Sequence, residues 1–209
     1  EDWQTYIRIN ELYAQAILDE AKGDSPIILV QDYQLALLPK LIKEKLPNAI
    51  VILYWHIPWP NSEIFGIMPW GNAFLDGILS SDIVGFQTPY MCNNFFDAVR
   101  ASLEARIDEE HDCVERHGHI CKVRAYPVSV EWPLERLSLI EDVDTCRQAI
   151  RGKFNIPLHN KVFLGVERLD YVKGIPERLS AFKKFLEENP KLHGKVNFIQ
   201  IAALSPRKE

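Results

Sequence analysis

The chain has 209 residues, of which 47% are hydrophobic and 25% charged, a composition typical of a globular protein with a substantial core. The formal net charge is −5 and no long basic block occurs, which argues against nucleic acid as the main partner but permits a local anion site. No apolar run reaches the length of a membrane span and no signal peptide is present, so we expect no membrane partner. The sequence leaves a homo-oligomer open.

The cysteines are scattered and suggest no disulfide framework, so we expect a reducing, cytoplasmic setting. They are Cys92, Cys113, Cys121 and Cys146. The chain starts without a Met, and its first residues have the pattern of an amphipathic helix interior. We therefore expect a fragment of a longer protein.

Short apolar runs rich in β-branched residues alternate with helical patterns along the chain. The expected helices are at residues 1–18, 35–46, 90–105 and 176–189. The expected strands are at residues 27–31, 49–55, 83–86, 119–130, 162–167 and 195–204. This alternation predicts an α/β fold with a mostly parallel sheet.

A polar, helix-prone stretch near residues 131–160 interrupts the alternation and is typical of an interdomain connector. We therefore divide the chain into a first domain at 1–132, a connector at 133–160 and the beginning of a second domain at 161–209. The last part supplies only two expected strands and one helix, so we expect it to be incomplete.

The segment GVERLDYVKGIPER (165–178) is the most informative of three strand ends with polar chemistry. Ligands of open α/β sheets collect at the carboxyl ends of the strands. Arg168 supplies a planar fork of donors, Lys173 adds a point charge, and a helix beginning near Pro176 adds backbone N–H groups. Together these suit a diphosphate, although the same residues also fit a surface turn that pairs its own charges.

Asp32 directly follows the apolar run IILVQ and permits two interpretations. Its carboxylate could cap the helix expected to begin near Tyr33, which is the commoner arrangement. It could instead accept hydrogen bonds from sugar hydroxyls at the edge of the sheet. The sequence does not decide between them.

The stretch LYWHIPWPNS (53–62) leaves an apolar strand for a stiff aromatic loop around His56. A lone His beside an apolar strand is usually a satisfied core residue, whereas the rigid surroundings favour a functional one. Trp55 and Trp59 could stack on a sugar face or fill the core. Asp32 and Glu63 could also be cast as a glycosidase carboxylate pair, but nothing in the sequence sets their separation.

The segment HDCVERHGHIC (111–121) holds three His and two Cys within eleven residues. It lacks the paired spacing of a structural zinc site. We therefore predict a solvated hairpin and no metal.

Five motifs together resemble the trehalose-6-phosphate synthase family, retaining glycosyltransferases of the GT-B fold. The family's HDYHL corresponds to QDYQL (31–35), and its HxPFP loop followed by SEIF corresponds to HIPWPNSEIF (56–65). GFQT (85–88) and ERLDYVKGIPERL (167–179) match almost letter for letter, and QIA (200–202) follows. The motifs occur in order over nearly the whole chain, which makes the resemblance specific.

The resemblance implies an acceptor-side and a nucleotide-sugar Rossmann-like domain, both incomplete here, and transfer of glucose from UDP-glucose to glucose 6-phosphate with retention. Arg168 and Lys173 then resemble the pair that binds the donor diphosphate and stabilises leaving UDP. Asp32 resembles the acceptor-side carboxylate, His56 the histidine that contacts the donor glucosyl group, and Ile57 lies where acceptor fit is set. Because Arg168 and Lys173 supply the charge stabilisation, we expect no metal or other cofactor.

The chain departs from the family pattern at several positions. Gln31 and Gln34 replace the family's two histidines, and Trp59 replaces a phenylalanine. Arg207 is displaced by one residue from the arginine that binds the acceptor phosphate, which leaves its acceptor-binding role open. The family's Gly-rich loop and its acidic donor loop have no counterpart here, so we expect the chain alone to have little or no activity.

Two other functions stay open beside trehalose biosynthesis and the osmoprotection that the resemblance implies. A sibling activity with the same donor uses glycerol 3-phosphate and makes glucosylglycerol phosphate. A non-catalytic module that binds a sugar nucleotide is the other, because two Gln residues flank the segment around Asp32.

Overall fold

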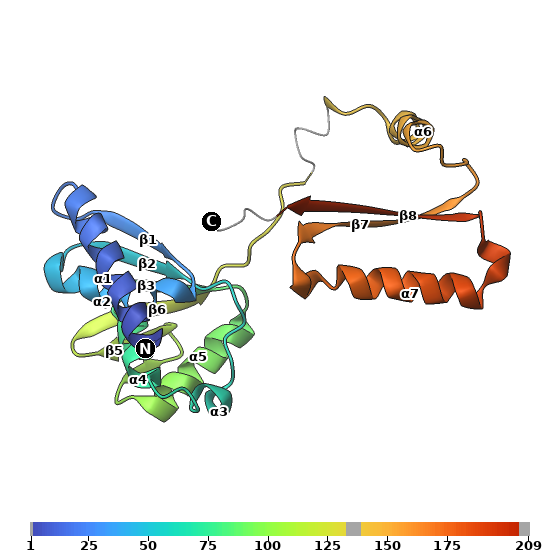
Figure 1. Cartoon of the computed structure of the whole chain (residues 1–209). Helices are drawn as coiled ribbons and strands as arrows, with labels where there is room; N and C mark the ends of the chain where they lie inside the picture. The colour runs from blue at the N-terminus through green and yellow to red at the C-terminus, as the bar shows by residue number, and fades with distance from the viewer. Residues whose placement is uncertain (1, 133–138, 205–209) are drawn as a thin grey trace. The chain divides into compact units, whose positions relative to one another are not determined.

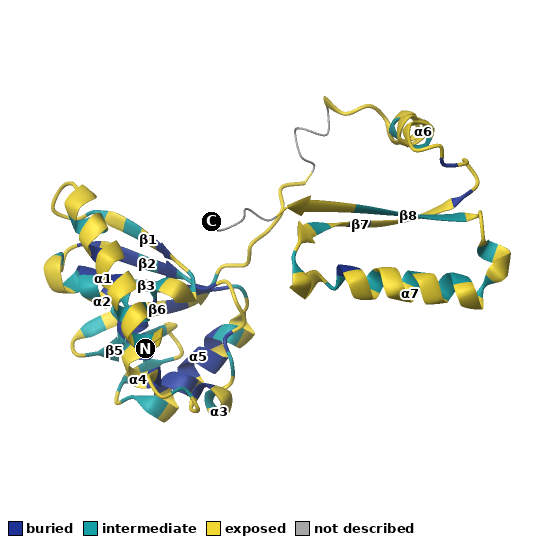
Figure 2. Ribbon diagram, viewed as in Figure 1, coloured by how far each residue is buried: buried dark blue, intermediate teal, exposed yellow. Residues whose placement is uncertain are grey.

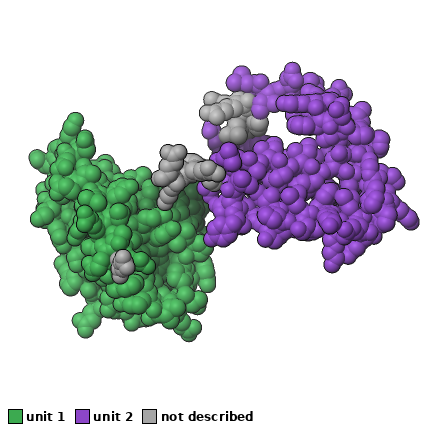
Figure 3. All heavy atoms as spheres, in the orientation of Figure 1, with its two compact units in different colours: residues 1–130 green, residues 131–209 purple. Residues whose placement is uncertain are grey.

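The computed structural model describes residues 2–132 and 139–204 of the chain. The chain divides into two compact units, unit 1 at residues 1–130 and unit 2 at residues 131–209 (Figure 3). No helix within the described ranges combines the length and the apolar character that crossing a membrane requires.

Unit 1 is built on a six-stranded sheet with the order β1-β2-β3-β6-β5-β4 (Figure 1). Its strands are β1 (Ile27–Gln31), β2 (Ile50–Tyr54), β3 (Ile83–Phe86), β4 (Arg106–Asp108), β5 (Cys113–Arg116) and β6 (His119–Ala125). The first four strands of that order are parallel, and β5 and β4 extend the sheet antiparallel. The carboxyl ends of the parallel strands therefore share one edge, which we call the carboxyl edge of unit 1.

Helices pack against this sheet and bury its central strands. They are α1 (Asp2–Glu20), α2 (Leu38–Lys45), α3 (Ser62–Phe65), α4 (Gly71–Leu79) and α5 (Pro89–Ser102). The core is apolar and continuous, with Leu53, Phe86 and Phe95 fully buried, and Figure 2 shows this burial concentrated in the central strands and in α5. The alternating elements predicted from the sequence are thus present, and the α/β prediction is confirmed.

The helix predicted at residues 35–46 is wrong in its extent. A 3-10 turn, η1 (Tyr33–Leu35), comes first, and α2 begins only at Leu38. Pro39 occupies the first turn of α2, where its missing N–H costs nothing, and so it marks a helix start and not a helix interior.

The strand predicted at residues 119–130 is also too long, because β6 ends at Ala125. Tyr126 still donates its N–H to the Phe86 carbonyl, but Pro127 has no N–H to continue the ladder.

Helices α3 and α4 were not predicted. Helix α4 is short and contains Gly77, a poor helix former. A Cβ at Gly77 would lie 2.5 Å from the Ala36 carbonyl oxygen, so only glycine lets α4 approach the segment before α2 this closely. The residue that hides this helix from sequence analysis is the one that packing requires.

Unit 2 contains two parallel strands and the helix between them. They are β7 (Lys161–Leu169), α7 (Ile175–Glu188) and β8 (Val196–Leu204), all close to the predicted bounds. The strands β7 and β8 pair in register along nine positions. Phe163, Phe182 and Phe198 pack together and join α7 to this sheet. Helix α6 (Val143–Lys153) precedes β7, with its N-terminus capped by the Asp142 carboxylate. The roles given to the two domains from the sequence stay predictions.

Candidate functional site

The carboxyl edge of unit 1 brings Asp32 and His56 together. Asp32 follows β1 directly and His56 follows β2 by two residues, and these strands are neighbours in parallel register. The His56 backbone N–H donates to Asp32 Oδ1 over 3.1 Å. Residues 24 positions apart in the sequence thus form one polar corner, as the ends of adjacent parallel strands should.

Asp32 has a backbone conformation that side chains rarely adopt. Its φ is 64° and its ψ is −178°, a region populated almost only by glycine that costs about 1–3 kcal/mol for other residues. Its carboxylate makes no capping hydrogen bond to η1, so the helix-cap interpretation is wrong. The strained backbone instead turns the carboxylate toward the loop after β2.

His56 is exposed, and the interpretation of it as a core residue is wrong. Its Nε2 lies 2.7 Å from Gln31 Oε1, and its ring meets the edge of the Tyr54 ring at a centroid distance of 4.7 Å. Ile57 beside it is also exposed, with 42% of its surface accessible. The loop therefore presents an imidazole and an aliphatic side chain to solvent.

Sequence analysis overlooked the residues that support this corner. The Tyr54 hydroxyl donates to the Tyr126 carbonyl over 2.6 Å. A Cβ at Gly85 would lie 2.8 Å from the Tyr54 ring and 3.1 Å from the Tyr126 ring, so glycine makes room for both. The GFQT motif, which contains Gly85, was the signal that could have identified them.

Trp55 and Trp59 fill the core beneath the loop. They are 4% and 2% exposed, and their rings meet edge to face at 4.8 Å. Trp59 also packs on Phe65 and Phe95, while Asn94 donates to the Trp59 carbonyl. Of the two interpretations offered for these tryptophans, core filling is correct, and they anchor a rigid loop under His56.

In unit 2 the end of β7 presents two exposed cations, Arg168 and Lys173. The Arg168 side chain is 64% exposed, and its Nη2 forms a loose ion pair with Asp170 Oδ2 at 3.6 Å, beyond hydrogen-bond distance. The turn therefore pairs its own charges in part, as the alternative interpretation had it. Lys173 is exposed at the end of η3 (Tyr171–Lys173), and its ammonium has no partner within residues 2–132 and 139–204. Gly174, at φ 60°, turns the chain from η3 into α7. Arg168 is the second-last residue of β7, Lys173 ends η3, and α7 begins at Ile175, so two cations and a helix N-terminus lie at the end of one strand, as predicted.

A network of partly buried polar side chains, which the sequence did not reveal, links the end of β7 to α7 and β8. Arg178 on α7 forms an ion pair with Glu167 at 2.6 Å and a hydrogen bond to Gln200 on β8. A Cβ at Gly165 would lie 2.3 Å from Gln200 Oε1, so glycine makes room for the network. Because Arg178 neutralises Glu167, that carboxylate is occupied and does not pair with Arg168.

The predicted acceptor residue Arg207 lies outside the described residues.

The His-rich segment forms the hairpin that was predicted. Strands β5 and β6 pair antiparallel, and His117 and Gly118 form the turn with φ of 52° and 76°. No group of three or more His, Cys, Asp or Glu side chains suited to a metal ion occurs among the described residues.

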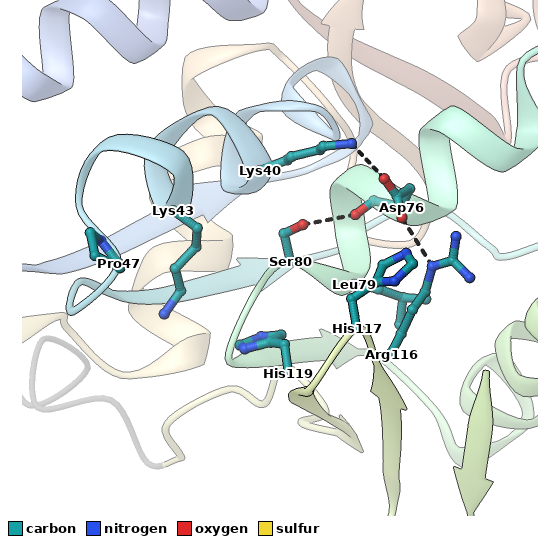
Figure 4. Close-up of a pocket in the computed structure, with 9 residues that line it drawn as sticks. All are labelled: Lys40, Lys43, Pro47, Asp76, Leu79, Ser80, Arg116, His117 and His119. Carbon is teal, nitrogen blue, oxygen red and sulfur yellow. Dashed lines mark hydrogen bonds and ion pairs between the residues drawn. The ribbon is translucent and has the colours of Figure 1, made fainter. Parts of the chain in front are cut away.

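This hairpin borders a cavity of about 350 Å³ at the amino-terminal edge of the sheet (Figure 4). Lys40, Lys43 and Arg116, which line this cavity, each form an ion pair. Asp76 accepts from Lys40 at 2.6 Å and from Arg116 at 3.0 Å, and Lys43 pairs with Asp82. Burial acts to raise the pKa of Asp76, but its bonds to the two cations outweigh burial and hold that pKa below its usual value.

The fold and the two strand ends define the class of this chain as an α/β protein of the GT-B type, which the solved structures confirm. An α,α-trehalose-phosphate synthase (UDP-forming) from Burkholderia xenovorans, solved in complex with glucose-6-phosphate, superposes with a TM-score of 0.79 at 26% identity. The superposition covers 98% of this chain and 45% of that one. The family model for glycosyltransferase family 20 matches residues 1–209, and the chain belongs to that family.

Curated proteins similar to this chain support the same family assignment. The chain is 35% identical over 209 residues to the α,α-trehalose-phosphate synthase [UDP-forming] of Pichia angusta, covering 97% of this chain and 43% of the relative. It is 32% identical to the glucosylglycerol-phosphate synthase of Picosynechococcus sp., covering 97% and 44%. The chain thus spans less than half the length of the curated relatives it matches.

Proposed function

We propose that the complete protein transfers glucose from UDP-glucose to glucose 6-phosphate with retention, giving trehalose 6-phosphate and UDP. The observation that carries the proposal is the corner at the carboxyl edge of unit 1, where a strained Asp32 holds the backbone of the His56 loop. Strain of this kind concentrates where function requires it. Membership of glycosyltransferase family 20 supplies the reaction class.

Each side chain has a role in this reaction. Arg168 and Lys173 bind the donor diphosphate and stabilise the charge that develops as UDP leaves, so the proposal includes no metal. Asp32 and Ile57 face the acceptor, and His56 contacts the donor glucosyl group. Arg207 remains a proposed ligand of the acceptor phosphate.

The experiment is release of UDP by the complete protein, measured with UDP-glucose and each acceptor in turn, with the product identified by mass. We expect release with glucose 6-phosphate and formation of trehalose 6-phosphate. Release with glycerol 3-phosphate alone would make the protein a glucosylglycerol-phosphate synthase, the activity named for the Picosynechococcus relative. Binding of UDP-glucose without release under either condition would favour the non-catalytic module.

A further inference from the structure

The imidazole of His56 is held on two sides although it is exposed. Gln31 Oε1 lies 2.7 Å from its Nε2, and the Tyr54 ring stands against it with an interplanar angle of 69°. The Tyr54 ring is itself fixed, because its hydroxyl donates to the Tyr126 carbonyl. An exposed side chain held this way has already lost the freedom that binding a ligand would otherwise cost.

Gln31 can reach the ring because of strand register. Gln31 ends β1 opposite Tyr54, which ends β2, and the Asp32 N–H extends the ladder to the Tyr54 carbonyl at 2.8 Å. His56 lies two residues beyond Tyr54, on the same side of the loop as Gln31. Gln31 also stands where the family pattern has a histidine. An amide oxygen accepts a hydrogen bond at every pH of interest, whereas an imidazole changes its role when it titrates.

We propose that Gln31 is a positioning residue for His56. Its side-chain oxygen accepts from Nε2–H, which holds the imidazole in the neutral Nε2–H tautomer and leaves Nδ1 as a lone-pair acceptor for a hydroxyl of the donor hexose. The identity of that hexose rests on the proposed function. The tautomer does not, because it is a property of the protein without substrate.

The side chains that contact the ring are Gln31 and Tyr54, an amide and a phenol. The Asp32 carboxylate contacts the His56 loop, but its Oδ1 accepts from the His56 backbone N–H and not from the ring. The Tyr54 phenol is engaged with a carbonyl. Neither Gln31 nor any other described side chain that contacts the ring brings a negative charge to it.

The first test is the ring nitrogen spectrum of the complete protein labelled with ¹⁵N-histidine, without substrate. We expect His56 to show a protonated Nε2 and an unprotonated Nδ1 at neutral pH. A protonated Nδ1, or the averaged mixture of a free imidazole, would overturn the proposal.

The second test uses three variants. Gln31→Met keeps the length of the side chain but removes the acceptor, so the tautomer preference should be lost and kcat/KM for the donor should fall about tenfold, the effect of one hydrogen bond. Gln31→Glu keeps an acceptor but adds a charge that favours the imidazolium, so activity should recover only as pH is raised. Gln34→Met is the matched control, because Gln34 belongs to the same QDYQL motif but makes no side-chain contact with His56.

The outcomes separate the inference from the proposed function. A Gln31→Met variant with the wild-type spectrum and rate would exclude the positioning role. Failure of the wild-type protein to release UDP would reject the proposed function, while the nitrogen spectrum would still decide how Gln31 holds His56.

Discussion

Two of the cationic clusters within the described residues differ in how tightly their charges are paired. At the amino-terminal edge of unit 1, Lys40 and Arg116 share the Asp76 carboxylate (Figure 4). At the end of β7 in unit 2, Arg168 is exposed and has only a loose ion pair with Asp170 at 3.6 Å. The exposed Lys173 ammonium has no partner among the described residues. Tightly paired cations stabilise a fold, whereas exposed cations with loose pairs or none are available to an anion. A basic cluster therefore indicates a binding site only when its charges are not already neutralised.

The strongest challenge to this comparison is Arg168→Ala. If Arg168 gives up its loose pair with Asp170 to bind the donor diphosphate, the variant should lose about 3 kcal/mol of transition-state stabilisation, a fall of about 10²–10³-fold in kcat. Its thermal midpoint should not change, because the side chain is largely exposed. UDP release and a melting curve on the same preparation measure both. Loss of stability with full activity per folded molecule would show that Arg168 serves the fold through its pair with Asp170.

Arg116→Ala should show the opposite behaviour. Arg116 is 18% exposed, donates to Asp76 and also donates to the Glu104 carbonyl at 2.7 Å. Removing these bonds should cost about 2 kcal/mol of unfolding free energy, measured by urea titration. The rate of UDP release per folded molecule should be unchanged. A drop in rate without a drop in stability would show that the cavity of Figure 4 takes part in the reaction.

Substitutions at Asp32 should have a smaller effect on stability, and the direction of that effect follows from the backbone conformation. At φ 64°, Asp32→Gly relieves strain that Asp32→Ala retains, so the glycine variant should be more stable than the alanine variant by about 1–2 kcal/mol. Both lack the carboxylate and should be equally impaired in transfer. Equal stability of the two variants would show that the backbone there is not strained.

The smallest effect concerns pH. The pKa of Asp76 is lowered in the folded protein, so the stability it contributes is present above the pKa of the unfolded chain and is lost as pH falls through the lower folded pKa. The difference in thermal midpoint between wild type and Asp76→Asn should therefore be constant near neutrality and shrink in acid, below about pH 4. A difference that persists unchanged in strong acid would contradict the ion pairs with Lys40 and Arg116.

Much of the fold was predictable because its signals are local. The runs at 27–31 and 83–86 became strands at those bounds, and the helix expected at 176–189 was shifted by a single residue. The predictions failed where packing overrides local preference. Gly77 disfavours a helix locally, yet α4 forms. Glycine is required there because α4 packs so closely on Ala36 that no side chain would fit.

The sequence by itself determined the candidate residues, because Asp32, His56, Arg168 and Lys173 occur at or just after strand ends in motifs of fixed spacing. Only the tertiary structure decided what surrounds each of them. Whether a carboxylate caps a helix or holds a neighbouring loop, and whether a cation is paired or free, depends on residues far away in the chain. Those contacts arise from strand register and from glycines at close approaches, and neither leaves a local pattern to be recognised.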